Sequence, residues 1–154
     1  MNQSKESYLQ YWKNETKSQS RLNCYLTLNR EYELADYLYS VRDTKQRQIL
    51  TKYRLSDHRL AIETGRHKKT WLPKEERVCG HCMTGEVETE MHFLLYCDKY
   101  SSQRDSLFTE MTTYIPNFYK LNPEEKLRIL MGEGAMAPLA AKYVFSCHSL
   151  RDTE

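Results

Sequence analysis

Residues 79–97 read CGHCMTGEVETEMHFLLYC, and this stretch decides the fold that the sequence predicts. Two residues separate Cys79 from Cys82, nine residues lie between Cys82 and His92, and four lie between His92 and Cys97. A Cys-x-x-Cys turn lets two thiolates face one ion, and we place His92 and Cys97 near the two ends of a short helix. A Cys₃His set closes a tetrahedral shell, which is typical of a structural zinc site.

The chemistry of these side chains favours zinc. Thiolate and imidazole ligands suit Zn²⁺, whereas Mg²⁺ and Ca²⁺ require oxygen ligands. Residues 86–91 contain neither Gly nor Pro, so we expect them to begin the helix that carries His92. Glu88 and Glu90 are then expected to be solvated residues of the first helical turn. The alternative is that Cys79 and Cys82 are ordinary thiols.

Other residues in and outside this stretch have simpler explanations. Gly80 is expected to relieve the tight backbone between the first two cysteines. His81 is expected to make a loop contact rather than to bind the metal. Cys24 and Cys147 are isolated in the sequence, and we expect both to be small core residues rather than reactive thiols.

The composition indicates a globular protein from a reducing compartment. Hydrophobic residues make up 40% of the 154 residues and charged residues 29%, which excludes a disordered chain. Five cysteines are an odd number, and three of them cluster with a histidine, which favours a metal over disulfides. No apolar run approaches the ~20 residues of a membrane span, and residues 1–16 lack the pattern of a signal peptide. We therefore expect an intracellular protein, in the nucleus or cytoplasm, without a membrane partner.

The low content of turn residues favours helices. With only 5 Gly and 4 Pro, we predict a mainly α-helical fold, a small domain of several short helices in which the metal module is embedded. Strand structure is confined to a short β-ribbon around the first cysteine pair. We expect one compact domain with four blocks: an N-terminal helical segment (1–41), a basic helical segment and loop (42–77), the metal module (78–100) and C-terminal helices (101–154).

Capping and breaking residues predict where the helices lie. Helices are expected around Tyr8–Trp12, over Tyr32–Leu38, after a cap at Asp43 or Thr44, after a cap at Ser56 or Asp57, from Tyr100 to Ile115, after Asn122-Pro123, and from Leu139 to Leu150. Gly65 is expected to end the fourth of these in a left-handed conformation. Pro116 and Gly132 are expected to end the fifth and the sixth.

One segment is basic although the whole chain is nearly neutral. The formal charge is +2, and residues 52–77 hold eight Lys or Arg against four Asp or Glu. Basic side chains beside an aromatic one are typical of nucleic-acid contacts, because cations neutralise phosphates and a ring stacks on a base. The candidate contact residues are Arg54, Arg59, Arg66, His67, Lys68, Lys69 and Trp71. The alternative is a solvated loop with Trp71 buried in the core.

A longer pattern surrounds the metal candidates. It runs through Tyr53-Arg54-Leu55, Asp57-His58, Gly65-Arg66, Cys79-x-x-Cys82, Glu88-Thr89-Glu90, His92-Phe93-Leu94 and Cys97. Over residues 37–104, with a weaker similarity at 139–151, this order resembles the C-terminal zinc-binding (CCHC-type) region of reverse transcriptases from non-LTR retrotransposons. The resemblance implies Zn²⁺ on Cys79, Cys82, His92 and Cys97, and a nucleic-acid partner, RNA or DNA.

The resemblance does not extend to the catalytic domains of such proteins. The sequence has no Asp-Asp pair to hold the Mg²⁺ of a polymerase, and no Pro-Asp dipeptide of the associated nuclease. We therefore expect no enzyme but a zinc- and nucleic-acid-binding module: a remnant, a fragment of an element protein, or a captured host protein. The alternative, favoured by the 12 Tyr, is a zinc-stabilised protein-interaction domain that does not bind nucleic acid.

Overall fold

The chain is mainly helical, as the sequence predicts. The computed structural model describes residues 3–29, 31–67, 69 and 71–153, and within these ranges no strand forms. The α-helices are α1 (Gln3–Ser18), α2 (Asn23–Leu28), α3 (Tyr37–Ser40), α4 (Thr44–Arg54), α5 (Ala61–Thr64), α6 (Ser101–Tyr114), α7 (Pro123–Leu130) and α8 (Ala137–Arg151). The shorter turns are η1 (Ser20–Leu22), η2 (Lys74–Glu76), η4 (Asp98–Tyr100), η5 (Phe118–Lys120), η6 (Gly134–Met136) and a π-helix, η3 (His92–Tyr96).

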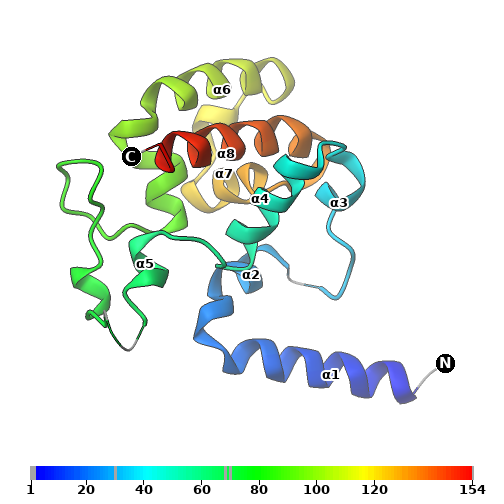
Figure 1. The fold of residues 1–154 in the computed structure, drawn as a ribbon. Helices are drawn as coiled ribbons and strands as arrows, with labels where there is room; N and C mark the ends of the chain where they lie inside the picture. Colours follow the sequence, from blue (N-terminus) through cyan, green and yellow to red (C-terminus); the bar gives the residue numbers. More distant parts are fainter. Residues whose placement is uncertain (1–2, 30, 68, 70, 154) are drawn as a thin grey trace.

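Helix α8 lies at the centre of the fold (Figure 1). It packs against α4, α6 and α7. Its fully or almost fully buried face consists of Ala137, Ala140, Ala141, Tyr143, Val144 and Cys147. The small alanines let the neighbouring helices approach closely, and Cys147 is the small core residue that we expected. The buried core extends from Tyr37 to Cys147 and draws on all four predicted blocks.

Three sequence signals for helix ends are confirmed. Asp43 caps α4, because its carboxylate accepts a 2.9 Å hydrogen bond from a backbone N–H of the first turn. Asn122 and Glu125 form a reciprocal capping box at the start of α7. Gly132 follows α7 with a φ of +87°, a conformation that favours glycine. These signals mark the start of α4 and both ends of α7, two helices that pack against α8.

The region between Tyr32 and Leu38 is not the helix that we predicted. Only α3 is helical there, and it begins at Tyr37. The ring of Tyr32 instead packs on α1, with its centroid 5.4 Å from that of Tyr8 and 5.5 Å from that of Trp12. These edge-to-face contacts direct the chain toward α1 and away from a helical path.

The segment after α4 also differs from the prediction. Helix α5 begins at Ala61, so neither Ser56 nor Asp57 caps it, and Ser56 has a left-handed φ of +54°. Gly65 ends α5 with a φ of −70° rather than in a left-handed conformation. Its need for glycine is steric, because a Cβ at this position would lie 2.7 Å from Cγ of Arg77.

Arg54, at the end of α4, holds four elements together. Its side chain is buried, and its guanidinium donates to the carbonyl oxygen of Met131 and to Oδ1 of Asn29, the latter at 2.8 Å. It also lies over the ring of Tyr37, 4.7 Å from the centroid. Because these donors are used inside the fold, we leave Arg54 out of the proposed nucleic-acid surface.

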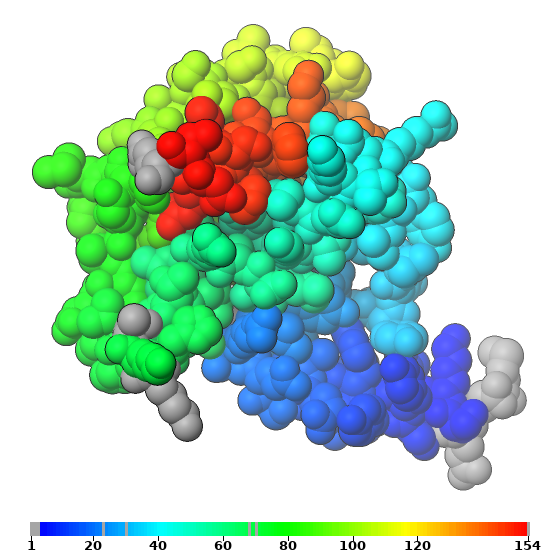
Figure 2. Space-filling view, in the orientation of Figure 1, coloured from blue at the N-terminus to red at the C-terminus, as the bar shows by residue number. Residues whose placement is uncertain are grey.

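Helix α1 extends from the rest of the molecule as an arm (Figures 1 and 2). The predicted helix around Tyr8–Trp12 is confirmed, and it runs from Gln3 to Ser18. Trp12 packs edgewise on Tyr25 of α2, whereas Tyr8 and Tyr11 are largely exposed. Within the described part of the chain, neither this helix nor any other combines the length and the hydropathy that crossing a bilayer requires.

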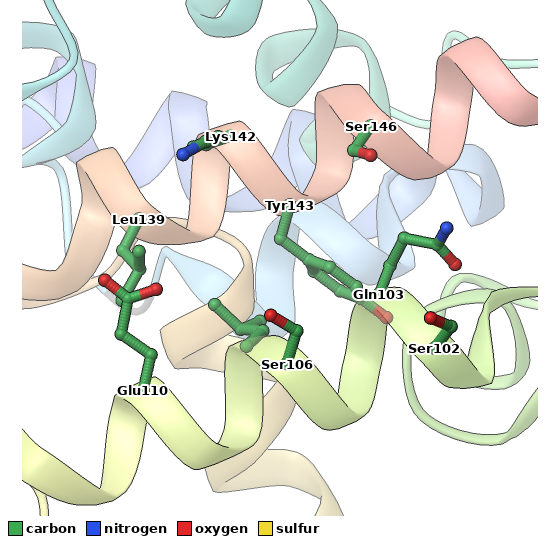
Figure 3. A pocket seen from close by; sticks show the side chains of 9 residues that line it. Ser102, Gln103, Ser106, Glu110, Leu139, Lys142, Tyr143 and Ser146 are labelled. Atoms are coloured by element: carbon green, nitrogen blue, oxygen red, sulfur yellow. The ribbon is translucent and has the colours of Figure 1, made fainter.

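A pocket of about 290 Å³ lies between α6 and α8 (Figure 3). Three serines and Gln103 line it together with the oppositely charged Glu110 and Lys142. Tyr143 reaches from α8 between the two helices, and its hydroxyl donates a 2.7 Å hydrogen bond to the carbonyl oxygen of Leu94. This bond joins α8 to the π-helix and so connects the core to the metal candidates.

Candidate metal centre

The four predicted ligands converge on one point. The ligand atoms of Cys79, Cys82, His92 and Cys97 all lie within 4.8 Å of one another. The two sulfurs of Cys79 and Cys97 are 3.8 Å apart, and Sγ of Cys82 is 3.4 Å from Nε2 of His92. Zinc–sulfur bonds of about 2.3 Å at tetrahedral angles give an edge of about 3.8 Å. The donors therefore fit one tetrahedrally coordinated ion.

A tight loop presents the first two cysteines. The backbone N–H of Cys79 donates to the carbonyl oxygen of Glu86 at 2.9 Å, and Val78 and Val87 form an antiparallel bridge. The β-ribbon that we predicted is thus reduced, among the described residues, to this single bridge. Its pairing still brings the two arms of the loop together and turns Cys79 and Cys82 toward the π-helix.

Glycine is required in this loop, but not where we expected. Gly85 has a φ of +69°, a left-handed conformation that side chains with a Cβ adopt at a cost. Gly80 is not among the glycines with a positive φ, and a Cβ built there would meet no atom within 4 Å. The conformational freedom of glycine that we expected to be needed at Gly80 is therefore needed at Gly85 instead.

The other two ligands lie on the π-helix η3. The N–H of Cys97 donates to the carbonyl oxygen of His92 at 2.8 Å, which closes a turn of five residues. In an α-helix, residues five positions apart would be rotated by about 140°. The wider turn instead places Cys97 beside His92, so both face the same ion. Residues 86–89 are not helical, which corrects the predicted start of this helix.

Hydrogen bonds orient two of the ligands. Nδ1 of His92 lies 3.0 Å from Oε2 of Glu86, so with a metal on Nε2 the ring would donate to this carboxylate through Nδ1. The hydroxyl of Thr84 lies 3.1 Å from Sγ of Cys82, where it can donate to a thiolate. Sequence reasoning missed Glu86, because a separation of six residues from His92 is not a recognisable motif.

Glu88 is buried, which corrects our expectation that it is solvated. Its side chain is 2% exposed. The carboxylate accepts a 2.7 Å hydrogen bond from the backbone N–H of Ala61, the first residue of α5, and pairs with the guanidinium of Arg151 at the end of α8. It also lies 3.7 Å from Sγ of Cys79. Glu88 therefore connects the metal centre to α5 and α8.

Glu90 is also buried and belongs to a second polar cluster. Its carboxylate accepts hydrogen bonds from Ser56 at 3.1 Å and from His58 at 3.0 Å. Burial raises the pKa of Glu90, but the hydrogen bond and charge of His58, with the bond from Ser56, lower it below its usual value overall. The ring of His58 stacks on Tyr53, so this cluster adjoins the aromatic core.

The cysteines differ in their tendency to ionise. Burial raises the pKa of the Cys79 thiol to about 12 and also raises the pKa of Cys97. Burial acts in the same direction on Cys82, but hydrogen bonds from Thr84, Cys79 and His92 outweigh it and lower that pKa to about 7. Buried thiols of this kind become thiolates at neutral pH when a cation lies between them, which suits a metal site.

Some of the residues predicted to contact nucleic acid have exposed side chains, and others are hydrogen-bonded within the protein. The exposed ones are Arg59, His67, Lys69 and Trp71. Trp71 is 63% exposed, so the alternative of a buried core residue is wrong. Arg66 bonds to Glu63 at 3.3 Å and to Ser20 at 3.2 Å. Lys68 lies outside the described residues.

Neither protein-family models, nor curated proteins, nor solved structures give a match to this chain. The resemblance to retrotransposon reverse transcriptases therefore rests on the residue pattern alone and stays a prediction. The metal centre is supported independently by its geometry, because Cys79, Cys82, His92 and Cys97 lie close enough to hold an ion whatever the ancestry of the chain.

Proposed function

We propose that this chain is a zinc-stabilised module that binds RNA or single-stranded DNA. Three sulfurs and one imidazole at tetrahedral spacing match the preferences of Zn²⁺ better than those of oxygen-seeking cations. All four positions of the tetrahedron come from the protein, which is the arrangement of a structural rather than a catalytic zinc. The ion would hold the Cys-x-x-Cys loop against the π-helix.

The observation that carries the binding half of the proposal is the exposure of Trp71. A tryptophan that is 63% exposed leaves most of its ring for contact with another molecule. Lys69 lies two positions before Trp71 and is also exposed. Under the proposal, the ring of Trp71 stacks on a base and the ammonium of Lys69 contacts a phosphate. The loop is held at its base, where the N–H of Leu72 donates to the carbonyl oxygen of Gly65 at 2.9 Å.

Substitution of Trp71 tests this function. We expect Trp71→Ala to weaken binding of a single-stranded oligonucleotide by about 5- to 150-fold, because base stacking contributes ~1–3 kcal/mol. The measurement is fluorescence anisotropy with RNA and DNA strands of about 16 nucleotides at low salt. Tyr39→Ala is the control, since Tyr39 is 71% exposed on α3. Equal effects of the two substitutions, or no binding by the zinc-loaded wild type, would contradict the proposal.

A second candidate function is protein interaction through α1, favoured by a separate observation. Tyr8, Tyr11 and Tyr32 are 50%, 61% and 50% exposed and gather on the arm formed by α1. Tyrosine is enriched at interface anchors because it contributes area with little loss of entropy. Under this function, a protein complex survives nuclease and high salt, and Tyr11→Ala disrupts it while Trp71→Ala does not.

A further inference from the structure

A cleft beside the metal centre joins three distant parts of the chain. It has a volume of about 470 Å³ and is lined by Arg59, His81, Arg151 and Asp152. Arg59 comes from the loop between α4 and α5, and His81 lies between the first two metal ligands. Arg151 and Asp152 come from the end of α8, which lies next to the segment that carries the ligands (Figure 1). The sequence gives no sign of this grouping.

The charges around the cleft favour an anion. Arg59 is exposed, and within the described residues its side chain makes no hydrogen bond or ion pair. Asp152 is the one acidic residue of the lining, and its carboxylate lies 3.2 Å from Nε2 of His148. Lys99 lies with Nζ 3.3 Å from Nδ1 of His81, which adds a further cation at the edge of the cleft.

Two of the lining residues are held in place by the fold. The guanidinium of Arg151 is fixed by Glu88, and it also donates to the carbonyl oxygen of Arg59 at 3.1 Å. Nζ of Lys99 lies 3.3 Å from Nδ1 of His81, and this contact orients the imidazole ring at the edge of the cleft. These bonds spare Arg151 and His81 the entropy loss of ordering on binding, whereas the exposed side chain of Arg59 would be ordered by the anion.

We propose that this cleft is a phosphate-binding site, with Arg59 as its principal contact and His81 as a second donor. The inference rests on the proposed function, since the phosphate would be a backbone group of the bound strand. The planar guanidinium of Arg59 carries several donors that match two phosphate oxygens at once. His81 lies within the Cys79–Cys82 turn, so a zinc ion that fixes this turn would also fix the position of His81 in the cleft.

The test compares two arginines outside α4, Arg42 before the helix begins and Arg59 in the loop that follows it. Arg59→Gln removes the proposed contact, while the backbone carbonyl used by Arg151 is retained. Arg42→Gln is the matched control, because Arg42 is exposed before the start of α4 and loses the same charge. With the zinc-loaded full chain and a single-stranded oligonucleotide, we expect Arg59→Gln to weaken binding about tenfold and to reduce the salt-dependence slope by about 1. Arg42→Gln should change neither value by a comparable amount.

The outcomes separate this inference from the function on which it rests. If the wild type binds the strand and the two variants bind equally, the cleft is not the site and the proposed function stands. If the wild type binds no strand, a titration with inorganic pyrophosphate decides whether the cleft binds phosphate. The NMR signals of residues 59 and 81 monitor this titration. A site for a free phosphate group is supported if these signals shift to saturation in the wild type and the signal of residue 81 does not shift in Arg59→Gln. Unchanged signals overturn the inference together with the function.

Discussion

The helical body and the metal loop of this protein, taken as α4 with α6–α8 and as residues 78–91, are held by different interactions. In the body, side chains such as Leu50, Leu130 and Val144 are fully buried against one another. In the loop, Cys79 is the one buried hydrophobic residue, and the other buried groups are the carboxylates Glu88 and Glu90. The body is therefore stabilised by apolar burial, whereas the buried groups of the loop are two carboxylates and a candidate metal ligand, so we expect the loop to depend on charge and on a bound ion.

The largest expected effect is the loss of the ion. Cys97→Ser removes one of four ligands, so we expect zinc to fall from about one per chain to a small fraction of that value. Because a structural zinc contributes roughly 10 kcal/mol in small modules, amides of the metal loop should exchange far faster with solvent. Elemental analysis and hydrogen exchange measure the two effects, and α7 and α8 should keep most of their protection.

Cys147→Ser is the control for this experiment. It makes the same chemical change at a buried cysteine of α8 that is not a ligand. We expect this variant to lose stability and to keep its zinc. The contrast between loop and body fails if Cys147→Ser releases the ion, or if Cys97→Ser retains it.

A smaller effect is expected from a cavity in the body. Leu130→Ala should lower the free energy of unfolding by about 3 kcal/mol, the usual cost of truncating a fully buried leucine. Chemical denaturation before and after chelation of zinc measures it. Since the body depends on burial, the loss should be similar in both states, and zinc affinity should not change. A loss seen only in the zinc-loaded protein would show that body and loop fold as one unit.

The smallest effect is expected from weakening the hydrogen bond between Glu86 and the candidate metal ligand His92. Glu86→Gln weakens the acceptor of the Nδ1–H of His92, so we expect zinc affinity to fall about tenfold, the lower end for such partners. Competition with a chromophoric chelator measures it. Glu75→Gln, at an exposed position of η2, is the control and should leave affinity unchanged. Equal affinities in the two variants would remove Glu86 from the metal centre.

Local signals in the sequence predicted the start of α4, both ends of α7 and the set of candidate ligands. The caps at Asp43 and Asn122 act within one turn, so their residue types alone are informative. The ligands are recognisable because thiolate and imidazole at Cys-x-x-Cys spacing serve few other purposes. Both predictions needed no knowledge of how distant parts of the chain meet.

Long-range contacts explain what the sequence did not predict. Glu88 and Glu90 look like solvated helix-start residues until α5, α8 and the α4–α5 loop are placed around them. Arg54 looks like a surface cation until the end of α7 supplies the carbonyl that it binds. The cleft that we propose for phosphate likewise combines residues 59, 81 and 151, which no periodicity or spacing relates.

The pairing of Glu88 with Arg151 also sets an order of assembly. All four metal ligands lie within residues 79–97, but the partner of Glu88 follows 63 positions after it. At a synthesis rate of ~5–20 residues per second, several seconds separate the emergence of the ligands from that of Arg151. During that interval a nascent chain can already capture zinc while the carboxylate beside Cys79 still lacks its counter-charge. Under the proposed function, metal capture would thus precede closure of the core, and α8 would complete a site whose ligands had already met.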